Sequence, residues 1–149
     1  MATAIRRAEA RWQGALTTGH GDVTLTSGAC GPLGISWPAR VDVPDGQTSP
    51  EELLAAAQAS CFAMAFTAIL GREGQHPARM DVAVEIFLDP ATNGGFEVTR
   101  SVISVTVAVS GFEDDLFQAL AEEARDGCPI SAALRGNVQI TVDATMVAP

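Results

Sequence analysis

The feature that most constrains the fold is an uncharged run of 18 residues, from Leu53 to Leu70. Its start is well marked. Ser49 can act as the N-cap, Pro50 suits the first helical position, and Glu52 completes a Ser-x-x-Glu capping box. The pattern therefore predicts one long helix that begins after Ser49 and ends near Leu70, at the glycines that follow it.

A run of this length lies near the lower limit for a membrane-spanning helix. However, many of its residues are alanine, with glutamine, serine and threonine among the apolar positions. Glu51, Glu52 and Arg72 bracket it closely. An alanine-rich helix suits close packing on all sides, so we predict a buried helix inside the protein and no membrane contact.

The rest of the chain alternates between strands and shorter helices. Strands are expected at 8–16, 22–27, 34–43, 80–88, 96–109 and 138–145, and helices at 113–126 and 129–135. Pro44-Asp45-Gly46 and Asn93-Gly94-Gly95 supply turns. This order predicts an α+β fold with mainly antiparallel pairing, built as a single domain over residues 1–149.

Composition excludes several classes of protein. The 149 residues are 47% hydrophobic, which suits a folded globular protein. The net charge of −9 argues against a nucleic-acid partner, because phosphate binding needs clustered Lys and Arg. The first residues lack the apolar segment of a secretory signal, and three cysteines form no dense disulfide framework. We therefore expect a cytoplasmic protein.

Two cysteines stand in particular surroundings. Cys61 lies about a dozen residues into the long helix, where burial raises a thiol pKa, so a reactive Cys61 would need a nearby cation. Otherwise it is a small buried apolar residue. Cys128 precedes Pro129 at the start of a short helix, whose N–H groups favour a thiolate, although it could simply replace a Ser or Asp cap. Together the two favour a nucleophile and a resolving thiol.

A charge partner for such a thiol is present in the sequence. The capping box uses Glu52, which leaves Glu51 free to pair with an arginine. Arg40 is the expected partner, because it lies on the strand that leads into the long helix. Cys30 has no base, cation or metal-ligand spacing beside it, and the two histidines are too isolated to propose as metal ligands.

The chain resembles the OsmC/Ohr family of peroxide-detoxifying proteins, specifically its osmotically inducible OsmC branch. The resemblance is carried by two motifs, Thr48-Ser-Pro-Glu-Glu-Leu-Leu-Ala-Ala-Ala-Gln-Ala-Ser-Cys61-Phe-Ala-Met-Ala and Gly127-Cys128-Pro129-Ile-Ser-Ala-Ala-Leu134. The hairpin ending Asn93-Gly-Gly-Phe and the closing strand extend it over nearly the whole chain. It implies the OsmC-like fold, with a long central helix in an intertwined homodimer.

The resemblance also implies a function, thiol-dependent reduction of hydroperoxides and of organic ones in particular. It assigns Cys61 as the peroxidatic cysteine, Cys128 as the resolving one, Arg40 as the thiolate-stabilising arginine and Glu51 as its holder. Gln58 stands where the OsmC branch often has His. An external dithiol, in this family typically a lipoylated protein, would restore both thiols, and no metal or organic cofactor is implied.

Helix geometry adds an argument for a dimer. Ten helical residues separate Glu51 from Cys61, a rise of about 15 Å. A partner chain packed antiparallel along the helix would bring an Arg40–Glu51 pair to Cys61, so we predict a site built from two chains. An apolar lining from Phe62, Met64 and Phe66 would favour bulky organic peroxides. The alternative is a non-catalytic redox sensor or a hydrophobic-ligand-binding protein of the same fold.

Overall fold

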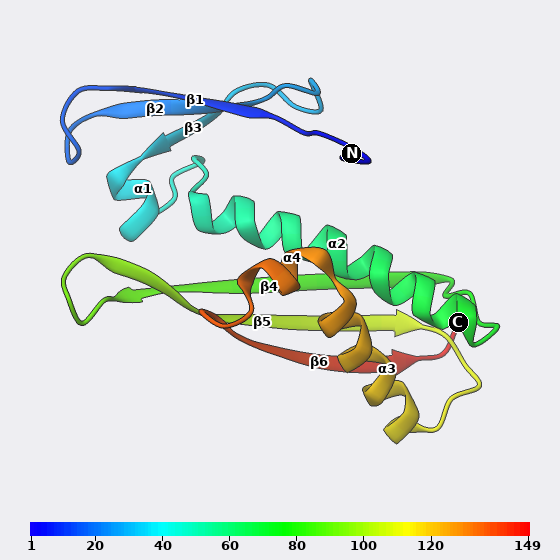
Figure 1. Ribbon diagram of the computed structural model, residues 1–149. Coiled ribbons are helices and arrows are strands. Elements are labelled where there is room, and N and C mark those ends of the chain that lie inside the picture. Colours follow the sequence, from blue (N-terminus) through cyan, green and yellow to red (C-terminus); the bar gives the residue numbers. More distant parts are fainter. The chain divides into compact units, whose positions relative to one another are not determined.

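The computed structural model describes residues 1–149 (Figure 1). The chain divides into two compact units, Met1–Leu53 and Leu54–Pro149, and we describe each by itself. The assignment of the whole chain to a single domain stays a prediction.

The first unit contains a small antiparallel sheet. Its strands follow the order β1 (Ala8–Gln13), β2 (His20–Leu25) and β3 (Leu33–Ser36), with Ala8 opposite Leu25 and His20 opposite Ser36. Two of the predicted strands are therefore shorter than expected, ending at Gln13 and Ser36.

Arg40 lies on a helix and not on a strand, which corrects the prediction for residues 34–43. The helix α1 spans Trp37–Val41. The Ser36 hydroxyl accepts a hydrogen bond from the Ala39 N–H at 3.3 Å, and Pro38 stands in the first turn, where its missing N–H leaves no donor unpaired. These two residues turn the chain into a helix where the sequence pattern suggested a continued strand.

The long helix α2 spans Pro50–Arg72, close to the predicted bounds. The Ser49 hydroxyl accepts from the Glu52 N–H at 3.1 Å, as an N-cap should. The Glu52 carboxylate accepts from the Thr48 hydroxyl at 2.7 Å, so the second half of the capping box is replaced by a neighbouring contact. Glu51 takes no part in the cap.

The second unit is built on a sheet of β4 (Arg79–Pro90), β5 (Phe96–Ala108) and β6 (Gln139–Val147). β4 and β5 form the predicted antiparallel hairpin, whereas β5 and β6 are parallel. The helices α3 (Asp114–Gly127) and α4 (Pro129–Leu134) form the crossover that parallel neighbours require (Figure 1). Pairing is thus mainly antiparallel, as predicted, with one parallel pair.

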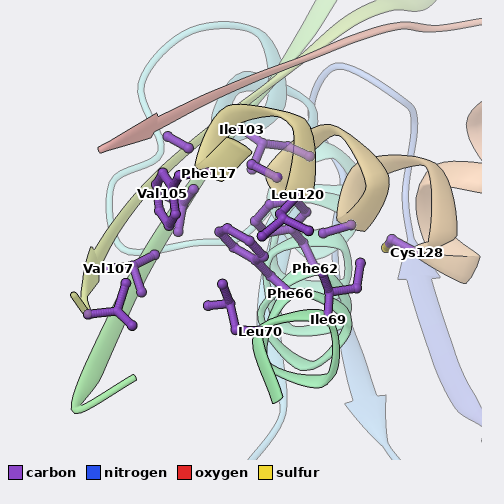
Figure 2. Close-up of a cluster of buried hydrophobic side chains, with 14 residues drawn as sticks. Phe62, Phe66, Ile69, Leu70, Ile103, Val105, Val107, Phe117, Leu120 and Cys128 are labelled. Carbon is purple, nitrogen blue, oxygen red and sulfur yellow. The ribbon is translucent and has the colours of Figure 1, made fainter. Parts of the chain in front are cut away.

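The core of the second unit lies between its helices and one face of this sheet (Figure 2). The rings of Phe62, Phe66 and Phe117 are fully buried, with centroids 5.6 Å apart for the first pair and 5.5 Å for the second. Ile103, Val105 and Val107 of β5 face them, at alternate positions of the strand. Cys128 is a buried member of the same cluster, and the partly buried Cys61 packs against this cluster.

Only one face of α2 is buried within the chain. Its buried residues are Gln58, Phe62, Phe66, Ile69 and Leu70, which repeat at helical spacing. By length and composition α2 could cross a membrane, a test that core helices of soluble proteins also pass, and 28% of its apolar window is buried. The prediction of packing on all sides is therefore wrong for a single chain.

Candidate thiol site

Cys61 and Cys128 come together in the second unit. Cys61 lies midway along α2, one turn after Gln58 and one residue before the buried Phe62. Cys128 is the residue between α3 and α4, with Pro129 at the first position of α4. The two thiols interact with each other, although they are far apart in the sequence. Both are free thiols, Cys128 fully buried and Cys61 half-buried.

The surroundings shift the pKa values of the two thiols in opposite directions. Burial is the main cause that raises the pKa of the Cys61 thiol; the Ile130 N–H opposes it, and the neighbouring Cys128 raises the pKa further. Burial would also raise the pKa of Cys128, but the Ser131 N–H, the Cys61 thiol and the Ser131 hydroxyl together bring it below the ordinary value. In the second unit alone, negative charge on the pair therefore favours Cys128.

Cys128 is the N-cap of α4, but its side chain makes no capping hydrogen bond. The Ser131 N–H and hydroxyl are nevertheless close enough to stabilise its thiolate. The prediction that Cys128 opens a short helix is confirmed.

Arg40 and Glu51 form the predicted ion pair in the first unit. The Arg40 Nε donates to both carboxylate oxygens, at 3.2 and 3.1 Å, and its second terminal nitrogen donates to Oε1 at 2.7 Å. Such a two-pronged contact holds the guanidinium in one orientation. The Glu51 side chain is 11% exposed and that of Arg40 is 32% exposed, so the arginine retains an open edge.

A small cavity of about 130 Å³ adjoins the arginine. The Arg40 guanidinium also lies over the Trp37 ring, with 5.8 Å between its central carbon and the ring centroid. The cavity is a mostly apolar space beside a fixed cation. Its lining residues, all in the first unit, are Trp12, Leu16, Ile35, Ser36, Trp37, Arg40, Thr48 and Pro50.

Gln58 makes a buried polar connection that the sequence analysis missed. Its side chain is fully buried, and its Nε2 donates to the Ser131 hydroxyl at 3.1 Å. Its Oε1 accepts from the Ser101 hydroxyl at 2.7 Å. The signal in the sequence was an amide on the apolar face of the helix, four residues before Phe62. A buried amide in such a place has to find hydrogen-bond partners.

Several sequence expectations fall outside the site. Phe62 and Phe66 are fully buried in the core, so they line no cavity in this chain, whereas Met64 is 68% exposed. Cys30 is an exposed free thiol of the first unit. No group of three or more His, Cys, Asp or Glu side chains is placed to hold a metal ion.

Comparisons with known proteins identify the family. The family model described as OsmC-like protein matches residues 43–143. Peroxiredoxin OsmC of Escherichia coli is 33% identical over 141 residues, covering 95% of this chain and 96% of the relative. An organic hydroperoxide resistance protein of Xanthomonas axonopodis is 31% identical over 100 residues, covering 64% of this chain and 65% of the relative.

A solved structure shows the same fold. The organic hydroperoxide resistance protein OhrB of Bacillus subtilis matches with a TM-score of 0.74 and 24% identity, covering 93% of this chain and 98% of that one. The chain belongs to the OsmC/Ohr family. Its fold is the α+β OsmC-like fold, with two small sheets and a long helix.

Proposed function

We propose that this protein is a thiol-dependent peroxidase, an antioxidant oxidoreductase that reduces organic hydroperoxides to alcohols and hydrogen peroxide more weakly. The observation that carries the proposal is the proximity of Cys61 and Cys128: Cys61 packs against the buried cluster that contains Cys128, and each thiol shifts the pKa of the other. Membership of the OsmC/Ohr family supports it, because relatives carry the names peroxiredoxin and organic hydroperoxide resistance protein.

The reaction uses the two thiols in order. The Cys61 thiolate attacks the terminal peroxide oxygen, the O–O bond breaks, and the alkoxide leaves as the alcohol after taking a proton, which leaves a sulfenic acid. Cys128 then attacks the Cys61 sulfur, forming the disulfide and releasing the oxygen as water. An external dithiol, such as that of a lipoylated protein, reduces the disulfide by exchange. No metal or organic cofactor takes part.

The Arg40–Glu51 pair supplies the cation that Cys61 needs. Burial and Cys128 both raise the Cys61 pKa, so its thiolate requires a positive neighbour at neutral pH. Arg40, held by Glu51 with its open edge outward, is suited to stabilise the thiolate and orient the peroxide. The cavity beside Arg40 is mostly apolar, which favours organic peroxides over hydrogen peroxide.

We place this cation in a second copy of the chain, in a homodimer with two shared sites. Glu51 and Cys61 are ten residues apart on the continuous helix α2, a rise of about 15 Å. An antiparallel partner would bridge that distance. Large apolar side chains that are exposed in the single chain provide the surface such a partner would cover, and they include Trp12, Leu16, Val43 and Met64. The cytoplasm would keep the thiols reduced between turnovers.

Consumption of cumene hydroperoxide with a dithiol reductant tests the proposal. Cys61→Ser should abolish turnover, because the nucleophile is lost. Cys128→Ser should react once and then stop, leaving Cys61 as a sulfenic acid or an overoxidised form that mass spectrometry can detect. Cys30→Ser is the matched control and should behave like the wild type. Retained turnover in Cys61→Ser would reject the mechanism.

One observation favours a second candidate, a non-catalytic redox sensor or hydrophobic-ligand-binding protein. The pKa of Cys61 is raised, which slows attack on a peroxide if no cation reaches the thiol. In that case Cys61 would oxidise slowly and without turnover, and Arg40→Ala would leave its rate of oxidation unchanged. The same peroxide assay therefore separates the two functions.

A further inference from the structure

A buried chain of hydrogen bonds connects three elements of the second unit, β5, α2 and α4, beside the thiol pair. The Ser101 hydroxyl of β5 donates to Gln58 Oε1 of α2, and Gln58 Nε2 donates to the Ser131 hydroxyl of α4. Ser101 and Gln58 are fully buried and Ser131 is 1% exposed. No solvent competes for these groups, so each hydrogen bond fixes the direction of the next.

Ser131 and Cys128 are near each other at the start of α4. Cys128 is the N-cap of α4 and Ser131 is its third helical residue, the two positions whose side chains meet in a capping box. The Ser131 hydroxyl accepts from Gln58, so its own hydrogen is free to point elsewhere. The Cys128 sulfur is the group beside it, and Ser131 stabilises the thiolate there.

The network places polar groups in two rows of residues that are otherwise apolar. Ser101 occupies the row of β5 that continues with Ile103, Val105 and Val107, all buried. Gln58 occupies the stripe of α2 that continues with Phe62 and Phe66. Apolar residues would fill both places and avoid burying an amide and a hydroxyl.

We propose that Gln58 is a positioning residue: it holds the Ser131 hydroxyl as a donor toward the Cys128 sulfur and so favours the Cys128 thiolate that is needed once Cys61 has been oxidised. The role rests on the proposed function in one respect. A Cys128 thiolate is ready to attack a Cys61 sulfenic acid, forming the S–S bond and breaking the S–O bond, and the oxygen leaves as hydroxide, which a proton from a solvent acid converts to water.

The test measures the Cys128 thiolate directly and needs no peroxide. In a Cys30→Ser, Cys61→Ser background, Cys128 is the only thiol, and its ionisation is followed by the ultraviolet absorbance of the thiolate. The chain contains no tyrosine, whose ionisation would overlap at high pH. The measurement also avoids alkylating reagents, which cannot easily reach a fully buried sulfur.

Three substitutions are compared in that background. Ser131→Ala removes the donor, and the thiolate fraction at neutral pH should fall about tenfold. Gln58→Met releases the hydroxyl from its fixed direction and should lower the fraction by a smaller factor, about threefold. Ser131→Thr keeps the hydroxyl and should restore the wild-type titration. Circular dichroism and thermal melting show whether each variant is folded.

Ser101→Ala is the matched control, because it removes the other hydrogen bond of the same amide but lies one link further from the sulfur. It should change the Cys128 titration less than twofold, about the limit of detection. Equal shifts from Ser101→Ala and Ser131→Ala, or no shift from Gln58→Met, would overturn the proposal. If the protein proves inactive toward peroxides, the proposed function fails while this titration still decides the role of Gln58.

Discussion

The two units of this chain differ in the functional residues that they contain and in the number of apolar side chains that they bury. The unit Leu54–Pro149 contains the Cys61 and Cys128 thiols and nearly all of the apolar core. The unit Met1–Leu53 contains the Arg40–Glu51 ion pair and an almost uncovered sheet, in which every residue of β1 is exposed. The buried side chains of this first unit are few and small, chiefly Ala39 and Thr48.

The comparison shows that the first unit exposes large apolar side chains but has almost no buried apolar core. Its large exposed side chains include Ile5, Trp12, Leu16, Val41 and Val43. A three-stranded sheet needs a hydrophobic face packed against something in order to be stable. The proposed second copy of the chain would supply that cover and, at the same time, bring together a fixed cation and a buried thiol.

The two units also differ in the charges around their functional side chains. In the second unit, burial raises the Cys61 pKa, and no cation contributes to lowering it. In the first unit, the Arg40 guanidinium is held by a carboxylate and keeps an open edge. In the proposed dimer, Arg40 of one copy would supply the cation that Cys61 of the other copy lacks.

The largest expected effect concerns packing in the second unit. Phe66→Ala removes a fully buried ring that contacts Phe62 and Phe117, and the free energy of unfolding should fall by about 3–5 kcal/mol. Phe96→Ala makes the same chemical change at a side chain that is 48% exposed and should lower it by less than about 1 kcal/mol. Urea unfolding measures both. Equal losses would mean that stability is not concentrated in this core.

The next effect concerns the charge pair of the first unit. Arg40→Ala should slow the reaction of Cys61 with cumene hydroperoxide about a hundredfold, because the thiolate loses its stabilising cation. Arg40→Lys keeps the charge without the two-pronged contact, so its rate should lie between those of the wild type and Arg40→Ala. Stopped-flow kinetics measures the rate. Arg72→Ala, which breaks only the exposed pair with Glu123, is the control and should react like the wild type.

If Arg40→Ala reacted as fast as the Arg72→Ala control, the Arg40–Glu51 ion pair would not assist the reaction of Cys61. Circular dichroism of each variant confirms that the comparison is made between folded proteins.

The elements with strong local signals could be predicted from the sequence. The Ser49 cap and the uncharged run predicted α2, and the regular alternation along residues 138–145 predicted β6. The helix α1 was missed because Trp37-Pro38-Ala39-Arg40 continues an apolar pattern, and only the Ser36 cap turns it into a helix. The parallel pairing of β6 with β5 was missed because alternation shows which face is buried but not which neighbour pairs.

The sequence predicted the two residue pairs of the site but not the hydrogen-bond partners of Gln58. Sequence context singled out Cys61, Cys128, Arg40 and Glu51, and the motif resemblance assigned their roles; the structure brings them together as two pairs, one in each unit. Their roles remain predictions. The partners of Gln58 could not be predicted, because Ser101 and Ser131 reach it only through the folding of β5 and α4 against α2.

The central claim is that Cys61 of one chain works with Arg40 of another, and a mixed dimer tests it most directly. Chains carrying Arg40→Ala and Cys61→Ser are co-expressed with different tags, and the mixed dimer is purified through both. Each parent dimer should be nearly inactive. If the sites are shared, the mixed dimer has one intact site and should show about half of the wild-type activity per dimer. A mixed dimer as inactive as its parents, or a fully active monomer, would contradict the account.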